Sequence, residues 1–234
     1  MSALHYVHRP HLSADLNKLE EGLHPTQQRL VFEELLAQNL SLRKVRKKFQ
    51  YNLAPACNQN TILGTQFLAN LPFKLTSAQS VVFNEIAKDM GEKKPMLRLV
   101  QGDVGSGKTV VAALAMLKAV ENGFQAALMA PTELLAEQHY RQFQSWFNPL
   151  NIEVAYLTSQ LSTKTKKDFL NNIAIGKSQL IIGTHALFQN DVNFKSLGIV
   201  VIDEQHRFGV HQRLALWQKG IQQTHVPHQL ILTA

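Results

Sequence analysis

The sequence predicts an α/β fold, in which a parallel β-sheet is flanked by helices and preceded by a helical segment. Two observations predict it. From about residue 71 onward, short apolar runs alternate with stretches of helical spacing, as in parallel strands joined by helical crossovers. One of these runs, 96–101, ends in a glycine-rich loop that leads into a helical stretch. Residues 1–70 show little β-like alternation, so they are predicted to form a separate helical connector.

Six apolar runs are predicted as strands of the sheet. They are 96–101, 125–130, 152–157, 180–183, 197–202 and a run that begins at 229. The run 197–202 is nearly continuous in apolar residues, which is typical of a parallel strand buried on both faces. It ends at Asp203, so this carboxylate is expected at the carboxyl end of a buried strand.

Helices are predicted between these strands and in the connector. Within the sheet domain they cover 110–120, 132–147 and a stretch around Phe169. In the connector, apolar residues at helical spacing predict a helix over 26–53, with Pro25 as a first-turn residue. A loop is expected to follow, from Pro55 to Gly64.

The composition is that of a folded chain with a basic excess. Lys and Arg number 24 against 17 Asp and Glu, and the formal net charge of +7 suggests a polyanionic partner, most often nucleic acid. The single cysteine, Cys57, excludes an internal disulfide. No apolar run approaches the roughly 20 residues that span a bilayer, and the first residues lack the layout of a signal peptide. We therefore expect a cytoplasmic protein with no membrane partner.

Residues 102–109 (GDVGSGKT) match the phosphate-binding loop G-x-x-x-x-G-K-[ST]. Glycines let the backbone turn its N–H groups toward a phosphate, and the helix that follows adds its positive end. Lys108 would reach the β- and γ-phosphates, and the Thr109 hydroxyl would bind Mg²⁺. The predicted ATP-binding residues of the loop are Gly102, Gly105, Ser106, Gly107, Lys108 and Thr109.

Two acids at the end of the run 197–202 complete this predicted site. Asp203 would hold Mg²⁺, and Glu204 would orient and deprotonate the attacking water. Together with Lys108 they are the predicted catalytic residues. Alone, such a pair is also common as a capping pair at a strand end; the phosphate loop favours the catalytic interpretation.

Several segments resemble the motifs of superfamily 2 helicases, in the expected order. Residues 203–206 (DEQH) resemble motif II, and 71–79 (LPFKLTSAQ) resemble the adenine-reading segment. Residues 130–139 (APTELLAEQH) and 183–187 (GTHAL) are similar to two DNA-contacting motifs. Within this superfamily, 101–109 and 205–213 (QHRFGVHQR) resemble the RecG family.

The resemblance implies an ATP- and Mg²⁺-dependent helicase acting on branched DNA, with a RecA-like lobe over 71–234 that is cut off within motif III. Gln79 and Phe73 would lie at the adenine. The residues implied in DNA contact are Pro131, Thr132, Gly183, Thr184 and His185. The residues implied in coupling the nucleotide to DNA are Gln205, His206 and Thr233.

RecG-type helicases also have a second RecA-like lobe, whose arginines reach the γ-phosphate, and this partner lobe is absent from the sequence. An arginine of this kind contributes orders of magnitude in rate. We therefore expect the chain alone to bind ATP–Mg²⁺ weakly, to hydrolyse it slowly or not at all, and not to unwind DNA.

Other interpretations stay open at this point. Another phosphate-loop enzyme, such as a kinase or a transporter ATPase, shares the loop but not the DEQH tetrad. A non-catalytic nucleotide- or DNA-binding remnant shares every motif. Among helicases, the transcription-repair coupling factor and PriA are alternatives, and Gln205 favours RecG over both. Thr132 also suits a plain helix N-cap, and His185 a partly buried histidine.

Overall fold

The computed structural model describes residues 2–12, 14–50, 52–59, 62–158, 163–189, 191–204 and 225–234. The chain divides into two compact units, Met1–Tyr51 and Asn52–Ala234, and each is described by itself. The division lies ahead of residue 70, where the sequence predicted the end of the connector. Residues 52–59 and 62–70 therefore belong to the unit that contains the sheet.

The first unit is helical, as the sequence predicts. Its helices are α1 (Ser2–His8), α2 (Leu16–Glu20) and α3 (Pro25–Gln50). Asp15 caps α2 by accepting a hydrogen bond from the backbone N–H of Lys18. Between α1 and α3, the ring of Tyr6 stacks on His24 at a centroid distance of 4.8 Å. The long helix α3 confirms the helix predicted over 26–53, including Pro25 in its first turn.

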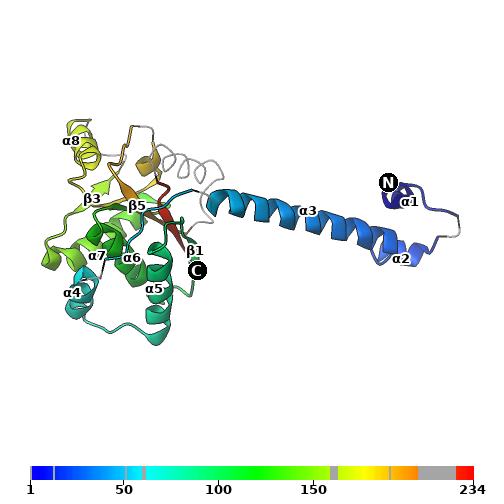
Figure 1. Cartoon of the computed structure of the whole chain (residues 1–234), viewed down its shortest axis with the longest axis horizontal. Helices are drawn as coiled ribbons and strands as arrows, with labels where there is room; N and C mark the ends of the chain where they lie inside the picture. The colour runs from blue at the N-terminus through cyan, green and yellow to red at the C-terminus, as the bar shows by residue number, and fades with distance from the viewer. Residues whose placement is uncertain are drawn as a thin grey trace. The chain divides into compact units, whose positions relative to one another are not determined.

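The second unit is built on a sheet whose six described strands are all parallel, in the order β1-β6-β5-β2-β4-β3 (Figure 1). The strands are β1 (Leu97–Gln101), β2 (Gln125–Met129), β3 (Val154–Leu157), β4 (Leu180–Gly183), β5 (Leu197–Asp203) and β6 (His228–Thr233). Each predicted strand is found with its ends shifted by at most two residues. The predicted α/β class with a parallel sheet is therefore confirmed.

Helices cover both faces of this sheet (Figure 1). One face carries α4 (Ile62–Asn70), α5 (Ser77–Met90), α6 (Lys108–Glu121) and α7 (Glu133–Phe147), followed by the short η1 (Asn148–Leu150). The other face carries α8 (Thr163–Ala174) and η2 (His185–Phe188). Helices α6, α7 and α8 confirm the predicted helices, whereas α4 and α5 are additions that the sequence analysis did not name.

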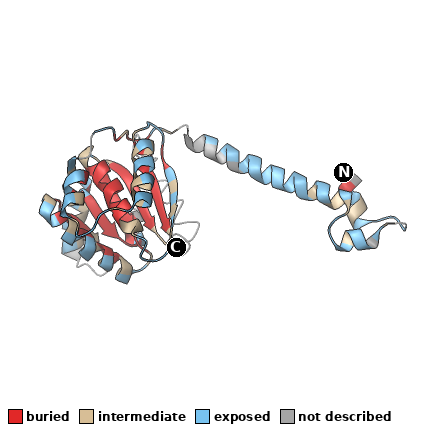
Figure 2. Cartoon of the chain, turned by 90° about the horizontal axis from the view of Figure 1, so that it is seen from below, coloured by how far each residue is buried: buried red, intermediate tan, exposed pale blue. Residues whose placement is uncertain are grey.

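The core forms as two apolar layers because successive strand residues point to opposite faces. In β2, Ala126 and Leu128 join the layer beneath α6 and α7, while Ala127 and Met129 join the opposite layer. Strands β2 to β6 and helix α6 are almost wholly buried, whereas the edge strand β1 and the outer faces of the covering helices are exposed in part (Figure 2). In α6 every residue from Val110 to Val120 is buried, so the helix that follows the phosphate loop is held on all sides.

The segment ahead of α5 is anchored to the sheet unit by polar contacts. Glu121, at the end of α6, accepts hydrogen bonds from the backbone N–H groups of Ile62 (2.6 Å) and Leu63 (3.1 Å) and so caps the start of α4. Gly64 lies buried inside α4, so the loop predicted up to Gly64 ends earlier. The Cys57 thiol is fully buried, and its desolvation raises its pKa to about 11.

None of the helices that the structure describes is both long and apolar enough to cross a bilayer.

His228 connects the segment ahead of α5 to the sheet. Its ring is fully buried, Nδ1 accepts a hydrogen bond from the backbone N–H of Met96 (3.0 Å), and Nε2 donates to the carbonyl oxygen of Pro55 (2.7 Å). Because one nitrogen accepts and the other donates, the ring is neutral. Burial lowers the pKa of His228 below its ordinary value of about 6.5.

Replacing His228 by Leu should destabilise the sheet unit, because two buried backbone groups lose their partners at roughly 1–3 kcal/mol each. The histidine also makes stability depend on pH. Since its folded pKa is lowered, the unfolded state binds the proton more readily, and stability is lost as pH falls below about 6.5. Urea unfolding at pH 7.5 and 5.5 measures both effects. The exposed-residue control His8→Leu should change neither, and an unchanged acid sensitivity in His228→Leu would contradict the assignment.

Candidate functional site

The predicted phosphate loop connects β1 to α6 at the carboxyl edge of the sheet. Gly105 and Gly107 have φ values of +82° and +79°, in the left-handed region that glycine adopts without strain. Gly107 is also the N-cap of α6, so the helix begins at Lys108 and directs its first backbone N–H groups into the loop. The loop therefore has the backbone form that an anion-binding helix start needs.

The loop is braced from inside by its own lysine. The Lys108 ammonium donates hydrogen bonds to the carbonyl oxygens of Gly102 (2.5 Å) and Asp103 (2.9 Å). A Cβ atom on Gly102 would lie only 2.9 Å from the hydroxyl oxygen of Ser106, so a side chain there would force the Ser106 hydroxyl to move. The positive charge of Lys108 is thus held inside the curve of the loop.

Gln79 lies directly against the phosphate loop. Thr76 and Gln79 form a capping box at the start of α5, and the Gln79 amide nitrogen also donates to the carbonyl oxygen of Ser106 (2.9 Å). Thr76, Gln79, Gly102 and Lys108 help to line a cavity of about 150 Å³ beside the loop. Phe73, the other residue predicted at the adenine, is 46% exposed and is not among the residues that line this cavity.

The predicted metal-binding acid stands two strands away from the loop. Asp203 ends β5, and β6 pairs in parallel with both β5 and β1. Thr233, predicted to couple nucleotide to DNA, ends β6 between them, and its carbonyl oxygen accepts a hydrogen bond from the Gly102 N–H (3.3 Å). The loop, Thr233 and Asp203 therefore share one edge of the sheet.

Glu204 follows Asp203 in a backbone conformation that non-glycine residues rarely adopt. Its φ is +52°, and its N–H donates to the carbonyl oxygen of Leu232 (3.0 Å). A side chain in this region costs about 1–2 kcal/mol, and such residues cluster at functional sites. The turn places the predicted water-activating carboxylate directly after the strand that carries Asp203.

A histidine that sequence reasoning left without a role contacts Asp203. His139 of α7 approaches the Asp203 carboxylate at 2.7 Å from Nε2 to Oδ2, and both side chains are largely buried. His139 closes the segment 130–139 that resembles a DNA-contacting motif. It falls at the helical spacing of the buried residues Ala136, Phe143 and Phe147, which is the sequence signal for a position facing the core.

The residues predicted to contact DNA follow β2 and β4, which are neighbours in the sheet. Thr132 is exposed and caps α7 by accepting a hydrogen bond from the Leu135 N–H (3.3 Å), as its N-cap interpretation predicts. Pro131 is half-buried beside it, and His185 is exposed at the start of η2. These side chains lie at the same edge of the sheet as the phosphate loop, beyond β5.

Two further residues of this set are buried. Thr184 is only 2% exposed, and its hydroxyl has no hydrogen-bond partner among the described residues. A Cβ atom on Gly183 would lie 2.5 Å from the carbonyl oxygen of Leu157, so packing against β3 explains the glycine. The structure therefore brings Thr132 and His185 to the surface of this edge and places Thr184 within it.

Gln205 and His206, predicted to couple nucleotide and DNA, lie outside the described residues. Among those that are described, no group of three or more His, Cys, Asp or Glu gathers as a metal site. One carboxylate and one hydroxyl, Asp203 and Thr109, nevertheless suit Mg²⁺ at a phosphate loop, because that ion keeps several waters and takes further oxygens from the nucleotide.

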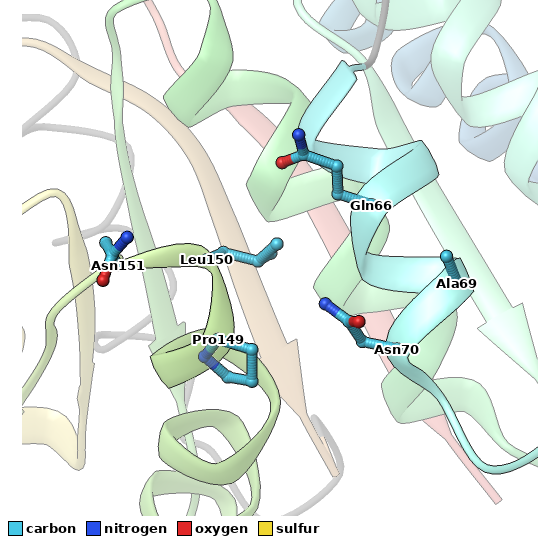
Figure 3. Close-up of a pocket in the computed structure, with 6 residues that line it drawn as sticks. All are labelled: Gln66, Ala69, Asn70, Pro149, Leu150 and Asn151. Carbon is cyan, nitrogen blue, oxygen red and sulfur yellow. The ribbon is translucent and has the colours of Figure 1, made fainter.

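A second hollow lies away from this edge (Figure 3). It has a volume of about 370 Å³ and is lined by residues at the end of α4 and around η1: Gln66, Ala69, Asn70, Pro149, Leu150 and Asn151. It shares no lining residue with the cavity beside the phosphate loop. Since no titratable side chain lines it, it offers no acid, base or nucleophile.

The chain is similar to known helicases. The family model for DEAD/DEAH box helicases matches residues 76–234. The ATP-dependent DNA helicase RecG of Escherichia coli (strain K12) is 56% identical over 232 residues, which cover 99% of this chain and 34% of that protein. The RecG of Pasteurella multocida (strain Pm70) is 54% identical with the same coverage. The chain thus spans about a third of the length of these relatives.

Solved structures agree with these sequence matches. A structure of RecG bound to a three-way DNA junction superposes with a TM-score of 0.76 at 42% identity, covering 88% of this chain and 27% of that one. The helicase MrfA bound to DNA and AMPPNP has a TM-score of 0.61 at 16% identity, covering 78% of this chain and 27% of that one. At that identity the second match supports the fold alone.

Gly107→Ala tests the contact between Gln79 and the loop. A Cβ atom there would collide with the Gln79 amide nitrogen. The amide would then move away from the Ser106 carbonyl oxygen, and the lost hydrogen bond should cost a further ~1 kcal/mol of stability. Gly123→Ala is a matched control, because Gly123 has a φ of +82° with nothing within 4 Å of the added atom.

Both substitutions should lower the free energy of unfolding by about 1–2 kcal/mol, because alanine is strained in a left-handed backbone conformation. Only Gly107→Ala should lose the further stability of the Gln79 hydrogen bond. In a Gln79→Ala background the two costs should become equal, as measured by urea unfolding. If the difference between the two alanines persists without the Gln79 side chain, the contact is not its cause.

Proposed function

Since the chain belongs to the DEAD/DEAH box helicase family, we propose that it is the ATP-binding lobe of a RecG-type DNA helicase that uses Mg²⁺ and acts on branched DNA. Because the chain spans about a third of the RecG relatives, unwinding is proposed for the whole protein and nucleotide binding for this lobe. One observation carries the proposal: the phosphate loop after β1 and Asp203 at the end of β5 flank the same strand, β6.

The phosphate loop would bind the nucleotide through its backbone and its lysine. The α6 N-terminus offers backbone N–H groups, and the left-handed glycines shape the loop around the anion. Lys108 would exchange its contacts with the carbonyl oxygens of Gly102 and Asp103 for phosphate oxygens. Gln79 is within hydrogen-bonding distance of the loop, which supports its assignment to the adenine-reading segment.

Asp203 and Thr109 would hold Mg²⁺, and Glu204 would act on the attacking water. When bound, the ion neutralises charge on the β- and γ-phosphate oxygens. Asp203 would hold metal-bound water rather than the ion itself, while the Thr109 hydroxyl would reach the ion from α6. The Glu204 carboxylate would orient the water and accept its proton.

DNA would bind along the ends of β2 and β4, next to the nucleotide. The exposed Thr132 hydroxyl and His185 ring suit donation to phosphate oxygens, and Pro131 shapes the turn before α7. Gly183 and Thr184 would support this surface from below, since the first has no room for a side chain and the second is buried. Thr233 would couple the nucleotide site to the DNA site, because its carbonyl oxygen accepts a hydrogen bond from the Gly102 N–H of the phosphate loop.

A second RecA-like lobe is the partner that this proposal requires. In two-lobed motors, closure follows the nucleotide state and brings arginines to the γ-phosphate. We therefore propose that this chain alone binds nucleotide, turns it over slowly and does not unwind DNA.

Lys108→Ala should lower the affinity of the chain for ADP by at least about tenfold, because a charge-assisted contact with phosphate is lost. Titration of a fluorescent ADP analogue measures it, and Lys93→Ala, at an exposed lysine, should bind like the wild type. Equal affinity in all three proteins would sink the assignment of the loop. ATP turnover with forked DNA should stay near background. Turnover stimulated by DNA and lost in Lys108→Ala would mean that a second lobe is not required.

His185→Ala should weaken binding of a forked DNA by about threefold to tenfold, since one phosphate contact disappears. Thr184→Val is the matched control at the adjacent buried position. It should leave DNA affinity within about twofold and should not lower stability, because the replaced hydroxyl has no hydrogen-bond partner among the described residues. Fluorescence anisotropy at two salt concentrations measures the DNA affinity of both variants, and urea unfolding measures their stability. A loss of DNA binding in Thr184→Val at unchanged stability would instead assign the phosphate contact to that hydroxyl.

A further inference from the structure

A buried hydrogen bond joins α7 to the predicted metal-binding carboxylate. The distance from His139 Nε2 to Asp203 Oδ2 is 2.7 Å, and the two side chains are 11% and 14% exposed. An ionised carboxylate only accepts, so Nε2 carries the proton and donates it. At this burial the contact is screened from water much less than a surface pair would be.

The histidine ring is itself held in place by the core. Phe143, one turn further along α7, makes an edge-on contact with the His139 ring at a centroid distance of 6.3 Å and an interplanar angle of 90°. Phe143 is fully buried and packs in turn on Trp146 and Phe147. The orientation of the imidazole is therefore fixed by aromatic packing rather than by the carboxylate alone.

A carboxylate bonded in this way is oriented for a second ligand. The bond to Oδ2 restricts rotation of the Asp203 carboxyl group and leaves Oδ1 for a metal-bound water. Groups that hydrogen-bond to metal-binding side chains orient them in this manner, and their loss typically costs about 10- to 100-fold in metal affinity. Among the residues that the structure describes, no other side chain hydrogen-bonds to this carboxylate, so His139 carries this task.

The same hydrogen bond attaches the metal site to the helix that begins at the DNA-facing residues. Thr132 caps α7, and His139 follows it by seven residues, about 10 Å along the helix axis. The buried face of the same helix carries His139 and packs on the core through Ala136 and Phe143. A shift of α7 as a rigid body would therefore move the group that hydrogen-bonds to the Asp203 carboxylate.

We propose that His139 is the positioning residue that holds the Asp203 carboxylate in the orientation the metal ion requires. This inference rests on the proposed nucleotide site, because it assigns the metal to Asp203. His139 itself touches neither nucleotide nor metal in this assignment.

Two variants of the 234-residue chain separate the hydrogen bond from the bulk of the ring. Gln places an amide N–H donor near the position of Nε2, whereas Leu fills similar space without a donor, and both residues suit a helix. The readout is the affinity of Mn²⁺ for the chain with ADP present, measured by the electron paramagnetic resonance signal of free Mn²⁺. Gln138→Leu, at the exposed neighbouring position, is the matched control.

His139→Leu should weaken Mn²⁺ binding by roughly 10- to 100-fold, and His139→Gln by less than about threefold. Metal-free ADP affinity should stay near wild type in both, which separates positioning from misfolding. The thermal midpoint should fall in His139→Leu, because a largely buried carboxylate loses its partner, and should fall less in His139→Gln. Wild-type Mn²⁺ affinity in His139→Leu, or equal losses in the Leu and Gln variants, would overturn the inference while leaving the nucleotide site intact. If the wild type shows no ADP-dependent Mn²⁺ binding that Lys108→Ala removes, the proposed function fails, and the inference with it.

Discussion

The parallel pairing of β6 with both β1 and β5 fixes the distance between the phosphate loop and the Asp203 carboxylate. Gln101 is opposite Thr233, and Leu232 is opposite Asp203, so the loop and the carboxylate begin at nearly the same level of the sheet. Neighbouring strands lie about 4.8 Å apart, which separates the two by about 10 Å. That spacing accommodates a phosphate chain and a hydrated ion. Every other feature of the site depends on this register.

Packing keeps the two sides of the site in register. The α6 helix is buried from Val110 to Val120, which limits movement of the loop from which it starts. On the Asp203 side, the aromatic residues of α7 hold His139, and His139 holds the carboxylate. The side proposed to bind nucleotide and the side proposed to bind DNA are therefore joined through one apolar layer, of which both α6 and α7 are part. Such a layer transmits displacement because it is densely packed.

Much of this could be predicted from local sequence, because strands buried on both faces and a glycine-rich loop are local signals. The loop, Lys108 and the strand that ends at Asp203 were found in this way. What depends on distant contacts could not be predicted. His139 lies 64 residues from its partner Asp203, and the burial of Thr184 follows from strand order. The backbone N–H groups at the start of α4 donate to Glu121, a residue far along the chain, and no local pattern reveals that contact. Phe73 was expected at the nucleotide, but the cavity beside the loop does not include it.

Hydrogen exchange of backbone amides with and without ADP and Mg²⁺ tests the central claim most directly, namely that the ends of β1, β5 and β6 form one nucleotide site. We expect protection of the loop 102–109 together with the turn at Asp203 and Glu204 and the end of β6, and little change in the exposed outer face of α8. Protection confined to the loop, with the turn at Asp203 unchanged at saturating Mg²⁺, would contradict it.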